Sequence, residues 1–452
     1  MNGNQFAVIG HPISHTMSPF IHARLFNLSG YAGSYGVFDI PPDALNEKMP
    51  ELRSLGGFNI TIPHKQAIIP FLDELNEKSA FFHSVNTVKN ENGRLVGYTT
   101  DGEGFCRALQ AAGAGLNGRT VVLGAGGAAR ALAFEAALHG GRVTVAARSH
   151  SMDAAWQLCR DLNAKVPGAR ADCCPMNGIS GPIDLLVNAT PVGMYPNTGE
   201  CPIAEEVVKT AACVFDAVYN PNETALIKLA RKNGVRAVGG MAMLVWQAAA
   251  AHEIWYGAKF RTEEIDRLCA DAVFEMKKRF GNLILCGFMG SGKTTVGTRL
   301  AEITGRDFID MDSFIEQSEN MTVPEIFARR GESEFRRMEQ EAVRALCQKN
   351  NLVIATGGGT LMHPGSTAAF KENGIILLLD AALDVIGKRL QNDNSRPLLA
   401  KPNRGEVMKQ LYTERLGIYR AAADMIVPAD EAAGQVAETI LKTLKKPPVQ
   451  KG

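Results

Sequence analysis

Residues 287–294, GFMGSGKT, have the types and the spacing needed to bind a nucleoside triphosphate. They fit the pattern G-x-x-x-x-G-K-[ST], whose backbone N–H groups surround the phosphates. In this pattern the lysine, Lys293, reaches the β- and γ-phosphates, and the hydroxyl of Thr294 holds Mg²⁺. The loop therefore predicts an ATP site made of Gly287, Met289, Gly290, Ser291, Gly292, Lys293, Thr294 and Thr295.

A second glycine-rich stretch, VVLGAGGAAR (121–130), predicts a dinucleotide site. Gly124, Gly126 and Ala129 fit G-x-G-x-x-G/A between an apolar strand and a helix. An NAD site usually has Asp or Glu after the next strand, whereas this chain has Arg148, 24 residues after Gly124. An arginine suits the 2′-phosphate of NADP, and the alternative for Arg148 is a plain surface residue at a strand end.

The elements that must position these loops form an alternation of buried strands and helices. Apolar runs such as QFAVIG (5–10), IDLLVNAT (183–190) and LVIATGGG (352–359) are separated by helical patterns. Such runs predict parallel strands buried on both faces, and hence an α/β protein. A long helical pattern, TEEIDRLCADAVFEMKKRF, ends before Gly281, so we expect a short joint between two halves there.

The composition argues against a nucleic-acid or membrane partner. The chain has 48 Lys and Arg residues and 47 Asp and Glu residues, so it has no strong electrostatic field that would attract a nucleic acid or a membrane surface. The most apolar stretch, MAMLVWQAAAA (241–251), is too short to span a bilayer. The first residues lack a signal-peptide pattern and the nine cysteines form no C-x-x-C pair, so we expect a reduced, cytoplasmic protein without a disulfide framework or a zinc site.

Five motifs follow the phosphate loop, and over residues 281–447 the chain resembles shikimate kinase. The motifs are FIDMDSFIE (308–316), GESEFRRME (331–339), ATGGGT (355–360), SRPLL (395–399) and ERLGIY (414–419). We expect Asp310 and Asp312 to follow an apolar strand and to alternate across it. The resemblance implies that Asp310 and Thr294 hold the metal, and that Asp312 accepts the proton of the attacking hydroxyl.

The same resemblance implies the other groups of the kinase site. Arg336 and Arg415 would hold the substrate carboxylate, to which planar guanidinium groups are suited. Arg396, in a polar stretch that is typical of a lid, would neutralise charge on the phosphoryl group in transfer. Arg389 matches an arginine that stacks on adenine. The full set of expected kinase substrate residues is Asp312, Arg336, Gly357, Gly358, Gly359 and Arg415.

Over residues 5–270 the chain resembles shikimate dehydrogenase. The motifs are GHPISHTMSPFIH (10–22), FNITIPHK (58–65), SVNT (84–87), TTDGEGF (99–105), NATPVGM (188–194), DAVYNP (216–221) and GMAMLVWQ (240–247). The resemblance implies that Lys65 and Asp101 meet in a cleft and act on a ketone. Hydride transfer to a ketone leaves an alkoxide that needs a proton, which a lysine–carboxylate pair can supply.

The remaining residues expected in this site fall into two sets. The dehydroshikimate-binding set is Thr16, Ser18, Asn59, Thr61, Asn86, Tyr219 and Gln247. The NADP-binding set is Gly124, Ala125, Gly126, Gly127, Ala128, Arg148, Asn188, Thr190, Met194, Gly240 and Met243.

Together the two resemblances predict a bifunctional α/β enzyme with three parts. Residues 1–103 with 238–276 would bind the substrate, 104–237 would form a Rossmann NADP-binding subdomain, and 281–447 a P-loop domain like the nucleoside monophosphate kinases, with a parallel sheet. The expected reactions are reduction of 3-dehydroshikimate by NADPH and phosphorylation of shikimate by MgATP. No oligomeric state is predicted.

Two alternatives remain open at this point. One is a dehydrogenase that uses NAD and acts on quinate as well as shikimate. The other is a chain in which one half only binds or regulates. The presence of every expected chemical residue in both halves favours two active enzymes.

Overall fold

The computed structural model describes residues 2–14, 16–195, 197–391 and 404–445. The chain divides into two compact units, Met1–Val273 and Phe274–Gly452. The boundary falls within the helix α11 (Thr262–Phe280), which ends directly before Gly281 as its sequence predicts. No described helix is long and apolar enough to cross a membrane.

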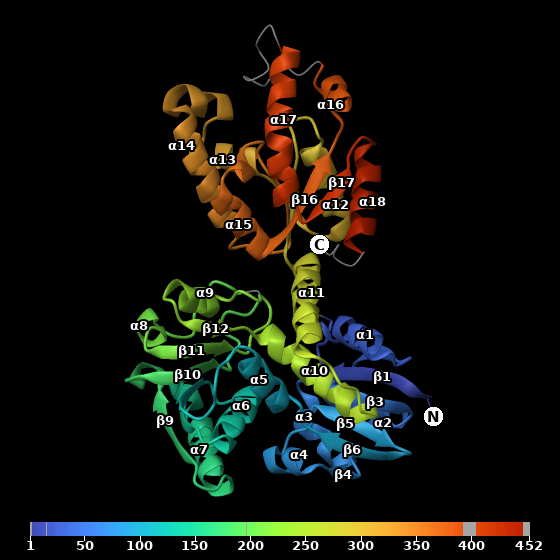
Figure 1. Cartoon of the computed structure of the whole chain (residues 1–452), viewed down its shortest axis with the longest axis vertical. Coiled ribbons are helices and arrows are strands. Elements are labelled where there is room, and N and C mark those ends of the chain that lie inside the picture. Colours follow the sequence, from blue (N-terminus) through green and yellow to red (C-terminus); the bar gives the residue numbers. More distant parts are fainter. Residues whose placement is uncertain (1, 15, 196, 392–403, 446–452) are drawn as a thin grey trace. The chain divides into compact units, whose positions relative to one another are not determined.

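The N-terminal unit contains two six-stranded sheets (Figure 1). The first has the order β2-β1-β3-β5-β6-β4. Its strands are β1 (Asn2–Gly10), β2 (Ser34–Asp39), β3 (Leu55–Ile60), β4 (Glu74–Leu75), β5 (Thr87–Glu91) and β6 (Arg94–Tyr98). Its helices are α1 (Ser18–Ser29), α2 (Leu45–Leu52), α3 (His64–Ala67) and α4 (Glu77–Phe82).

The first sheet also contains strands that were not among the apolar runs, and these make it a mixed sheet. The strand β5 is antiparallel to both β3 and β6. The cause is local, because Asn92 and Gly93 join β5 to β6 with φ values of 57° and 98°. Two residues with positive φ make the tight turn of a β-hairpin, and Asn-Gly is its most frequent sequence.

The second sheet is entirely parallel and has the order β12-β11-β10-β7-β8-β9. Its strands are β7 (Arg119–Leu123), β8 (Arg142–Ala147), β9 (Arg170–Pro175), β10 (Ile183–Asn188), β11 (Ala211–Asp216) and β12 (Arg236–Val238). Read from β9, this is the doubly wound order of dinucleotide-binding sheets, which reverses between β7 and β10. Ligands bind at such a reversal, beyond the carboxyl ends of the strands.

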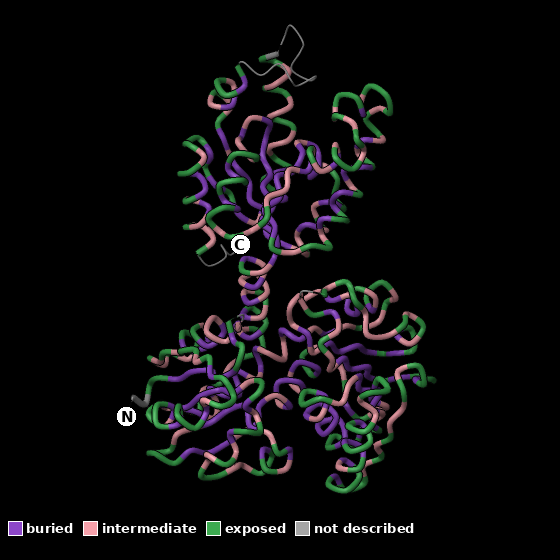
Figure 2. The backbone as a smooth tube through the Cα atoms, turned by 180° about the vertical axis from the view of Figure 1, so that it is seen from behind, coloured by how far each residue is buried: buried purple, intermediate pink, exposed green. Residues whose placement is uncertain are grey.

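Helices flank this second sheet and connect it to the first. They are α5 (Asp101–Ala111), α6 (Gly127–Leu138), α7 (Met152–Lys165), α8 (Glu205–Val208), α9 (Ala225–Lys232) and α10 (Gly240–Tyr256). The helices α5 and α10 pack closely against each other. Most residues of β7, β10 and β11 are buried, as the apolar runs predict, and Figure 2 colours the buried residues of the chain purple.

The C-terminal unit contains a five-stranded parallel sheet with the order β14-β15-β13-β16-β17. Its strands are β13 (Asn282–Cys286), β14 (Asp307–Asp310), β15 (Leu352–Ala355), β16 (Gly374–Asp380) and β17 (Met425–Pro428). Its helices are α12 (Lys293–Thr304), α13 (Met311–Glu319), α14 (Val323–Leu346), α15 (Pro364–Asn373), α16 (Leu383–Leu390), α17 (Arg404–Ala422) and α18 (Ala433–Leu444).

One placement in this unit differs from the sequence prediction. Asp310 ends β14, but Asp312 lies in the first turn of α13 and not on a strand. The Asp310 carboxylate accepts hydrogen bonds from the amides of Asp312 and Ser313, at 3.0 and 3.4 Å. An aspartate that caps a helix in this way ends the strand and starts the helix.

A buried pair of histidines joins α1 to α10 in the N-terminal unit. His22 Nδ1 and His252 Nε2 are 2.8 Å apart, and His252 Nδ1 contacts the hydroxyl of Tyr256. Both imidazoles have no exposed surface, and His22 stacks on Tyr35. Burial lowers the pKa of both histidines, that of His252 to about 3, and the neighbouring His252 lowers the pKa of His22 further. Both rings are therefore neutral in the folded protein at pH 7.

This pair predicts a loss of stability in acid. The unfolded histidines take up protons below about pH 6.5 and the buried ones do not, so the free energy of unfolding falls as the pH decreases from about 6.5 towards 3. The expected slope is about 1.4 kcal/mol per pH unit for each histidine. Urea unfolding followed by tryptophan fluorescence measures it, because Trp156, Trp246 and Trp255 are the only tryptophans and all lie in this unit.

The variant His252→Phe should reduce that slope between pH 6.5 and 5. The exposed His150 supplies the control, since His150→Asn should leave the slope unchanged. An unchanged slope in His252→Phe would contradict the assignment of the acid sensitivity to this pair.

Candidate active sites

The first site is built around an ion pair between Lys65 and Asp101. Lys65 lies on α3, directly after β3, and Asp101 is the first residue of α5, where the free N–H groups of the helix favour a carboxylate. Lys65 Nζ lies 2.5 Å from Asp101 Oδ2. The two side chains are 30% and 19% exposed, so a substrate can reach them. The pair can donate a proton to a substrate oxygen and polarise it.

A hydrogen-bond network orients Asp101. Asn86 Nδ2 donates to Asp101 Oδ1 at 2.8 Å, and the amide of Thr100 donates to Asn86 Oδ1 at 2.7 Å. The Thr100 hydroxyl lies 3.4 Å from Gln247 Oε1 on α10. The structure thus brings together three residues that were predicted from separate motifs, Asn86, Asp101 and Gln247.

Asn59 is held by partners that the sequence did not reveal. The Tyr35 hydroxyl donates to Asn59 Oδ1 at 2.7 Å, and Asn59 Nδ2 donates to the Thr87 hydroxyl at 3.0 Å. Burial raises the pKa of Tyr35 well above its usual range, so its phenol remains a donor. Tyr35 lies in no recognisable motif, whereas Thr87 ends the SVNT motif.

The other predicted substrate residues lie in three segments. The Thr16 hydroxyl accepts a hydrogen bond from the amide of Ser18 at 3.1 Å, at the N-terminus of α1. A helix N-terminus with two hydroxyls suits a carboxylate. Thr61 follows β3. Tyr219 follows β11, and burial raises its pKa, which keeps it protonated.

The dinucleotide loop lies at the reversal of strand order in the second sheet. Gly124 follows β7 with a φ of 100°, and its amide donates to the carbonyl of Ala146 on β8 at 2.8 Å. A side chain at Gly124 would also lie 2.9 Å from Thr190 Cγ2. Both the positive φ and this close contact therefore favour glycine here. Gly126 caps α6, whose first residues are Gly127 and Ala128, and Ala125 completes the turn. The helix N-terminus is available to a pyrophosphate.

Arg148 follows the second strand of the dinucleotide-binding pattern, the position that usually distinguishes NAD from NADP. It directly follows β8, which pairs with β7, and its side chain is exposed. Among the described residues, no hydrogen bond or ion pair holds its guanidinium. That leaves the guanidinium available to a phosphate.

The loop after β10 is organised by buried polar groups. Asn188 has no exposed surface, and its side-chain amide bonds to Asp216 Oδ1 at 2.9 Å and to the backbone amide and hydroxyl of Thr190 at 3.1 and 2.7 Å. Asn188 therefore shapes the loop, while Met194 is exposed on it. Gly240 begins α10, and Met243 lies one turn further along.

The second site surrounds the phosphate loop of the C-terminal unit. Gly292 caps α12, and the ammonium of Lys293 donates to the carbonyls of Gly287 and Phe288 at 2.9 and 3.3 Å. The Thr294 hydroxyl donates to Asp310 Oδ2 at 2.8 Å. A hydroxyl and a carboxylate oxygen side by side are ligands that Mg²⁺ prefers, so Thr294 and Asp310 fit the predicted metal.

The glycine loop 357–359 is where the predicted substrate residues converge. Arg415 Nη1 and the Tyr419 hydroxyl, both on α17, donate to the carbonyl of Gly358 at 3.0 and 2.6 Å. Asp312 Oδ1 lies beside Gly357, and the Arg336 guanidinium beside Gly359. Two arginines and the expected base thus meet at one loop.

Two residues of this second site were missed although their motifs were found. Glu339 is 3% exposed and accepts hydrogen bonds from Arg336 Nη1 at 2.5 Å and the Thr360 hydroxyl at 2.9 Å. It therefore fixes the position of Arg336. Tyr419 is buried, which raises its pKa to about 12 and keeps it a donor to the Gly358 carbonyl.

Of the two remaining predicted arginines, the structure describes only one. Arg389 lies along the phosphate loop, with Nη1 3.4 Å from the carbonyl of Ser291 and Nη2 bonded to the carbonyls of Asp430 and Glu431. Arg396 lies outside the described residues.

Known proteins resemble both units. Residues 8–88 match the shikimate dehydrogenase substrate binding domain, and residues 289–445 match shikimate kinase. The shikimate dehydrogenase (NADP(+)) of Caldanaerobacter subterraneus subsp. tengcongensis is 41% identical over 260 residues, which are 56% of this chain and 92% of that protein. The chain belongs to the shikimate dehydrogenase family. Its C-terminal unit adds a shikimate kinase domain, so the protein is bifunctional.

Further relatives agree on the dehydrogenase half. The shikimate dehydrogenase (NADP(+)) of Methanopyrus kandleri is 40% identical over 270 residues, 58% of this chain and 92% of that protein. The crystal structure of the Thermus thermophilus shikimate 5-dehydrogenase in complex with NADP(H) and shikimate is 35% identical, with a TM-score of 0.54, and covers 60% of this chain and 100% of that one.

Lys65→Ala should lower the turnover number of the dehydrogenase half by roughly 100-fold, because a positioned acid–base group is lost. Substrate affinity should change less. The initial rate of NADPH oxidation measures the effect, with Lys48→Ala as the control, since Lys48 pairs with exposed Glu51 on α2. Turnover within a few-fold of the parent would show that Lys65 is not the group.

Arg148→Ala should weaken NADPH far more than NADH. A charge-assisted hydrogen bond contributes about 1.5–3 kcal/mol, which is roughly 10- to 150-fold in affinity. Comparing the Michaelis constants for both cofactors tests this. Arg160→Ala, an exposed arginine on α7, should change neither constant. Equal losses for both cofactors would contradict a contact with the 2′-phosphate.

Proposed function

We infer that this chain reduces 3-dehydroshikimate to shikimate with NADPH and then phosphorylates shikimate with ATP. The observation that supports this best is the pair of Lys65 and Asp101, 2.5 Å apart in a chain whose other half carries the Thr294–Asp310 contact of a phosphate loop. The product of the first reaction is the substrate of the second, which gives the fusion a chemical reason.

In the reduction, NADPH supplies a hydride to the ketone carbon. The Lys65–Asp101 pair lies at the substrate oxygen, stabilises the charge that develops there and provides the proton that completes the alcohol. Thr16 and Ser18 hold the carboxylate of the substrate at the start of α1. Its hydroxyls are bound by Asn59, Thr61, Asn86, Tyr219 and Gln247.

NADP would bind across the reversal between β7 and β10. Gly124, Gly126 and the N-terminus of α6 would hold its pyrophosphate, and Arg148 its 2′-phosphate. The loop that Asn188 shapes, with Thr190 and Met194, would line the same crevice. Gly240 and Met243, at the start of α10, would lie along the nicotinamide.

In the phosphorylation, Thr294 and Asp310 would hold Mg²⁺, which would neutralise charge on the phosphates. Asp312 accepts the proton of the shikimate hydroxyl as it attacks, and Lys293 contacts the β- and γ-phosphates. Arg336 and Arg415 bind the carboxylate of shikimate above the glycine loop 357–359. Arg396 would stabilise the phosphoryl group in transfer.

The proposed division of labour has three parts. Residues 1–103 with 238–276 bind dehydroshikimate, residues 104–237 bind NADP, and residues 281–447 form the kinase. We place the enzyme in the cytoplasm, in line with the nine free cysteines. Its partners are small molecules and not nucleic acid or membrane.

A coupled assay tests the whole proposal. The full chain with 3-dehydroshikimate, NADPH and MgATP should oxidise NADPH and then form ADP. Lys293→Met should abolish ADP formation and leave NADPH oxidation unchanged, because that lysine contacts only the ATP phosphates. Lys65→Ala should slow ADP formation from 3-dehydroshikimate by up to the same roughly 100-fold, but leave ADP formation from added shikimate unchanged. ADP formation that failed with shikimate in the parent chain would refute the kinase assignment.

A further inference from the structure

A buried carboxylate lies between the two helices that begin the catalytic and cofactor sites. Glu135, on α6, is 1% exposed. Gly102, on α5 next to Asp101, makes room for it, since a side chain at Gly102 would lie 2.3 Å from Glu135 Oε1. A buried carboxylate needs partners for both of its oxygens.

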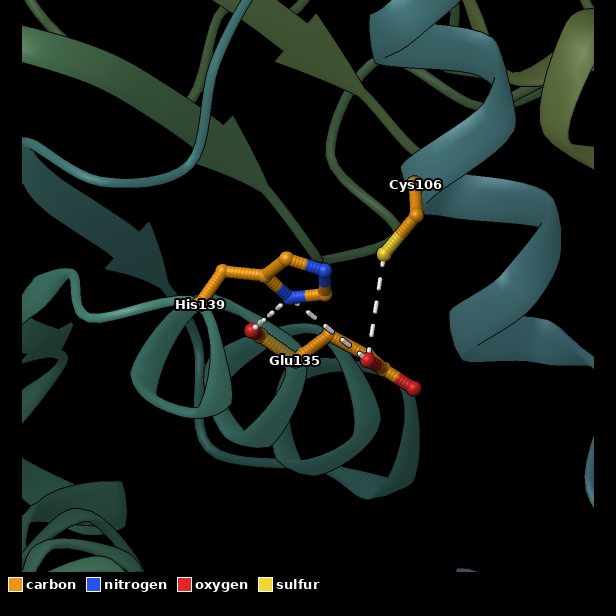
Figure 3. A group of neighbouring side chains, drawn as sticks. All are labelled: Cys106, Glu135 and His139. Carbon is orange, nitrogen blue, oxygen red and sulfur yellow. Dashed lines mark hydrogen bonds and ion pairs between the residues drawn. The ribbon is translucent and has the colours of Figure 1, made fainter.

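The two oxygens of Glu135 have different neighbours. Oε1 accepts a hydrogen bond from Lys78 Nζ on α4 at 3.0 Å. Oε2 faces Cys106 Sγ on α5 at 3.8 Å and His139 Nδ1, just after α6, at 3.9 Å. Lys78 thus neutralises the carboxylate through one oxygen and leaves the other to a thiol and an imidazole. Figure 3 shows the thiol of Cys106 and the imidazole of His139 beside the Glu135 carboxylate.

The three side chains have the spacing of a metal site. One ligand atom from each of Cys106, Glu135 and His139 lies within 4.8 Å of the other two. Ligands about 2.0–2.3 Å from a tetrahedral metal are separated from each other by roughly 3.3–3.8 Å, which matches the 3.8 Å between Cys106 Sγ and Glu135 Oε2. Glu135 and His139 are four residues apart at the end of one helix, so they share a face.

A hydrogen bond also determines which nitrogen of the His139 imidazole could bind a metal ion. His139 Nδ1 lies 2.9 Å from the backbone carbonyl of Glu135, and donation to that carbonyl leaves the lone pair on Nε2. The side chain of His139 is 51% exposed, which gives a metal ion a route from solvent and leaves space for a water as fourth ligand.

We propose that Cys106, Glu135 and His139 form a binding site for a zinc-like divalent cation that bridges α5 and α6. Thiolate, imidazole and carboxylate together are the ligand set of Zn²⁺ and of its substitutes Co²⁺ and Cd²⁺. On binding, the Cys106 thiol loses its proton to solvent and its sulfur bonds to the metal, while Glu135 Oε2 ligates and Oε1 stays paired with Lys78. The site is separate from both reactions.

A divalent cation offsets the charge of the carboxylate and deprotonates the Cys106 thiol, so one proton is released for each cation bound.

Cobalt titration of the full chain tests the proposal. One equivalent of Co²⁺ should produce a thiolate-to-cobalt charge-transfer band, and Zn²⁺ should remove it. Cys106→Ser should abolish that band, whereas Cys201→Ser, a half-buried cysteine in the loop before α8, should retain it. His139→Gln and Glu135→Gln should each weaken the affinity for Co²⁺ by roughly 10- to 100-fold or more. The loss of a residue that only hydrogen-bonds to a metal ligand already has an effect of that size.

NADPH oxidation in each variant shows that the dehydrogenase half is folded. The absence of a thiolate band from the parent chain would overturn the proposal. So would a band of equal strength in Cys106→Ser, which would place the cation on another cysteine. Unchanged Co²⁺ affinity in both His139→Gln and Glu135→Gln would likewise overturn it.

Discussion

The contact between Lys65 and Asp101 links two segments on which the geometry of the dehydrogenase site depends. It joins α3, which follows β3, to the first residue of α5. The helix α5 in turn packs along α10, which carries Gln247. This ion pair therefore links the first sheet to the helices that lead into the second sheet.

Buried carboxylates perform a similar task elsewhere in both units. Asp216 and Glu339 are 0% and 3% exposed, and each accepts hydrogen bonds from the segments that it organises. Burial raises the pKa of Asp216, which its hydrogen bonds to Thr224, Val218 and Asn188 oppose. A hydrogen bond to a charged group contributes about 1.5–3 kcal/mol, so these groups stabilise the loops that they contact.

The features that could be predicted from the sequence are the ones encoded locally. Each phosphate loop is a run of a few residues between a strand and a helix, so its place at a sheet edge follows from the order of elements. The end of α11 before Gly281 is also encoded locally, because basic residues followed by glycine are a typical helix end. The antiparallel strand β5 could also have been predicted from Asn92 and Gly93, and the helical place of Asp312 from the capping position of Asp310.

The rest depends on contacts between distant segments. Tyr35 meets Asn59 and Tyr419 meets Gly358 only after the sheets have formed, and no pattern in the chain links these pairs. The grouping of Cys106 with Glu135 and His139 is of the same kind, because its members come from two helices. Sequence motifs identified which residues could react, while the groups that orient them became visible only in three dimensions.

The β5–β6 hairpin also implies an order of assembly. A two-residue turn closes in roughly 1–10 μs, because the strands it joins are neighbours in the chain. The parallel pairs β1–β3 and β7–β10 must wait for far longer loops to close. Asn86 precedes β5 and Asp101 follows β6, so folding of the hairpin alone places the amide and the carboxylate near each other. The polar centre of the dehydrogenase half is thus among the earliest parts of the chain to take shape.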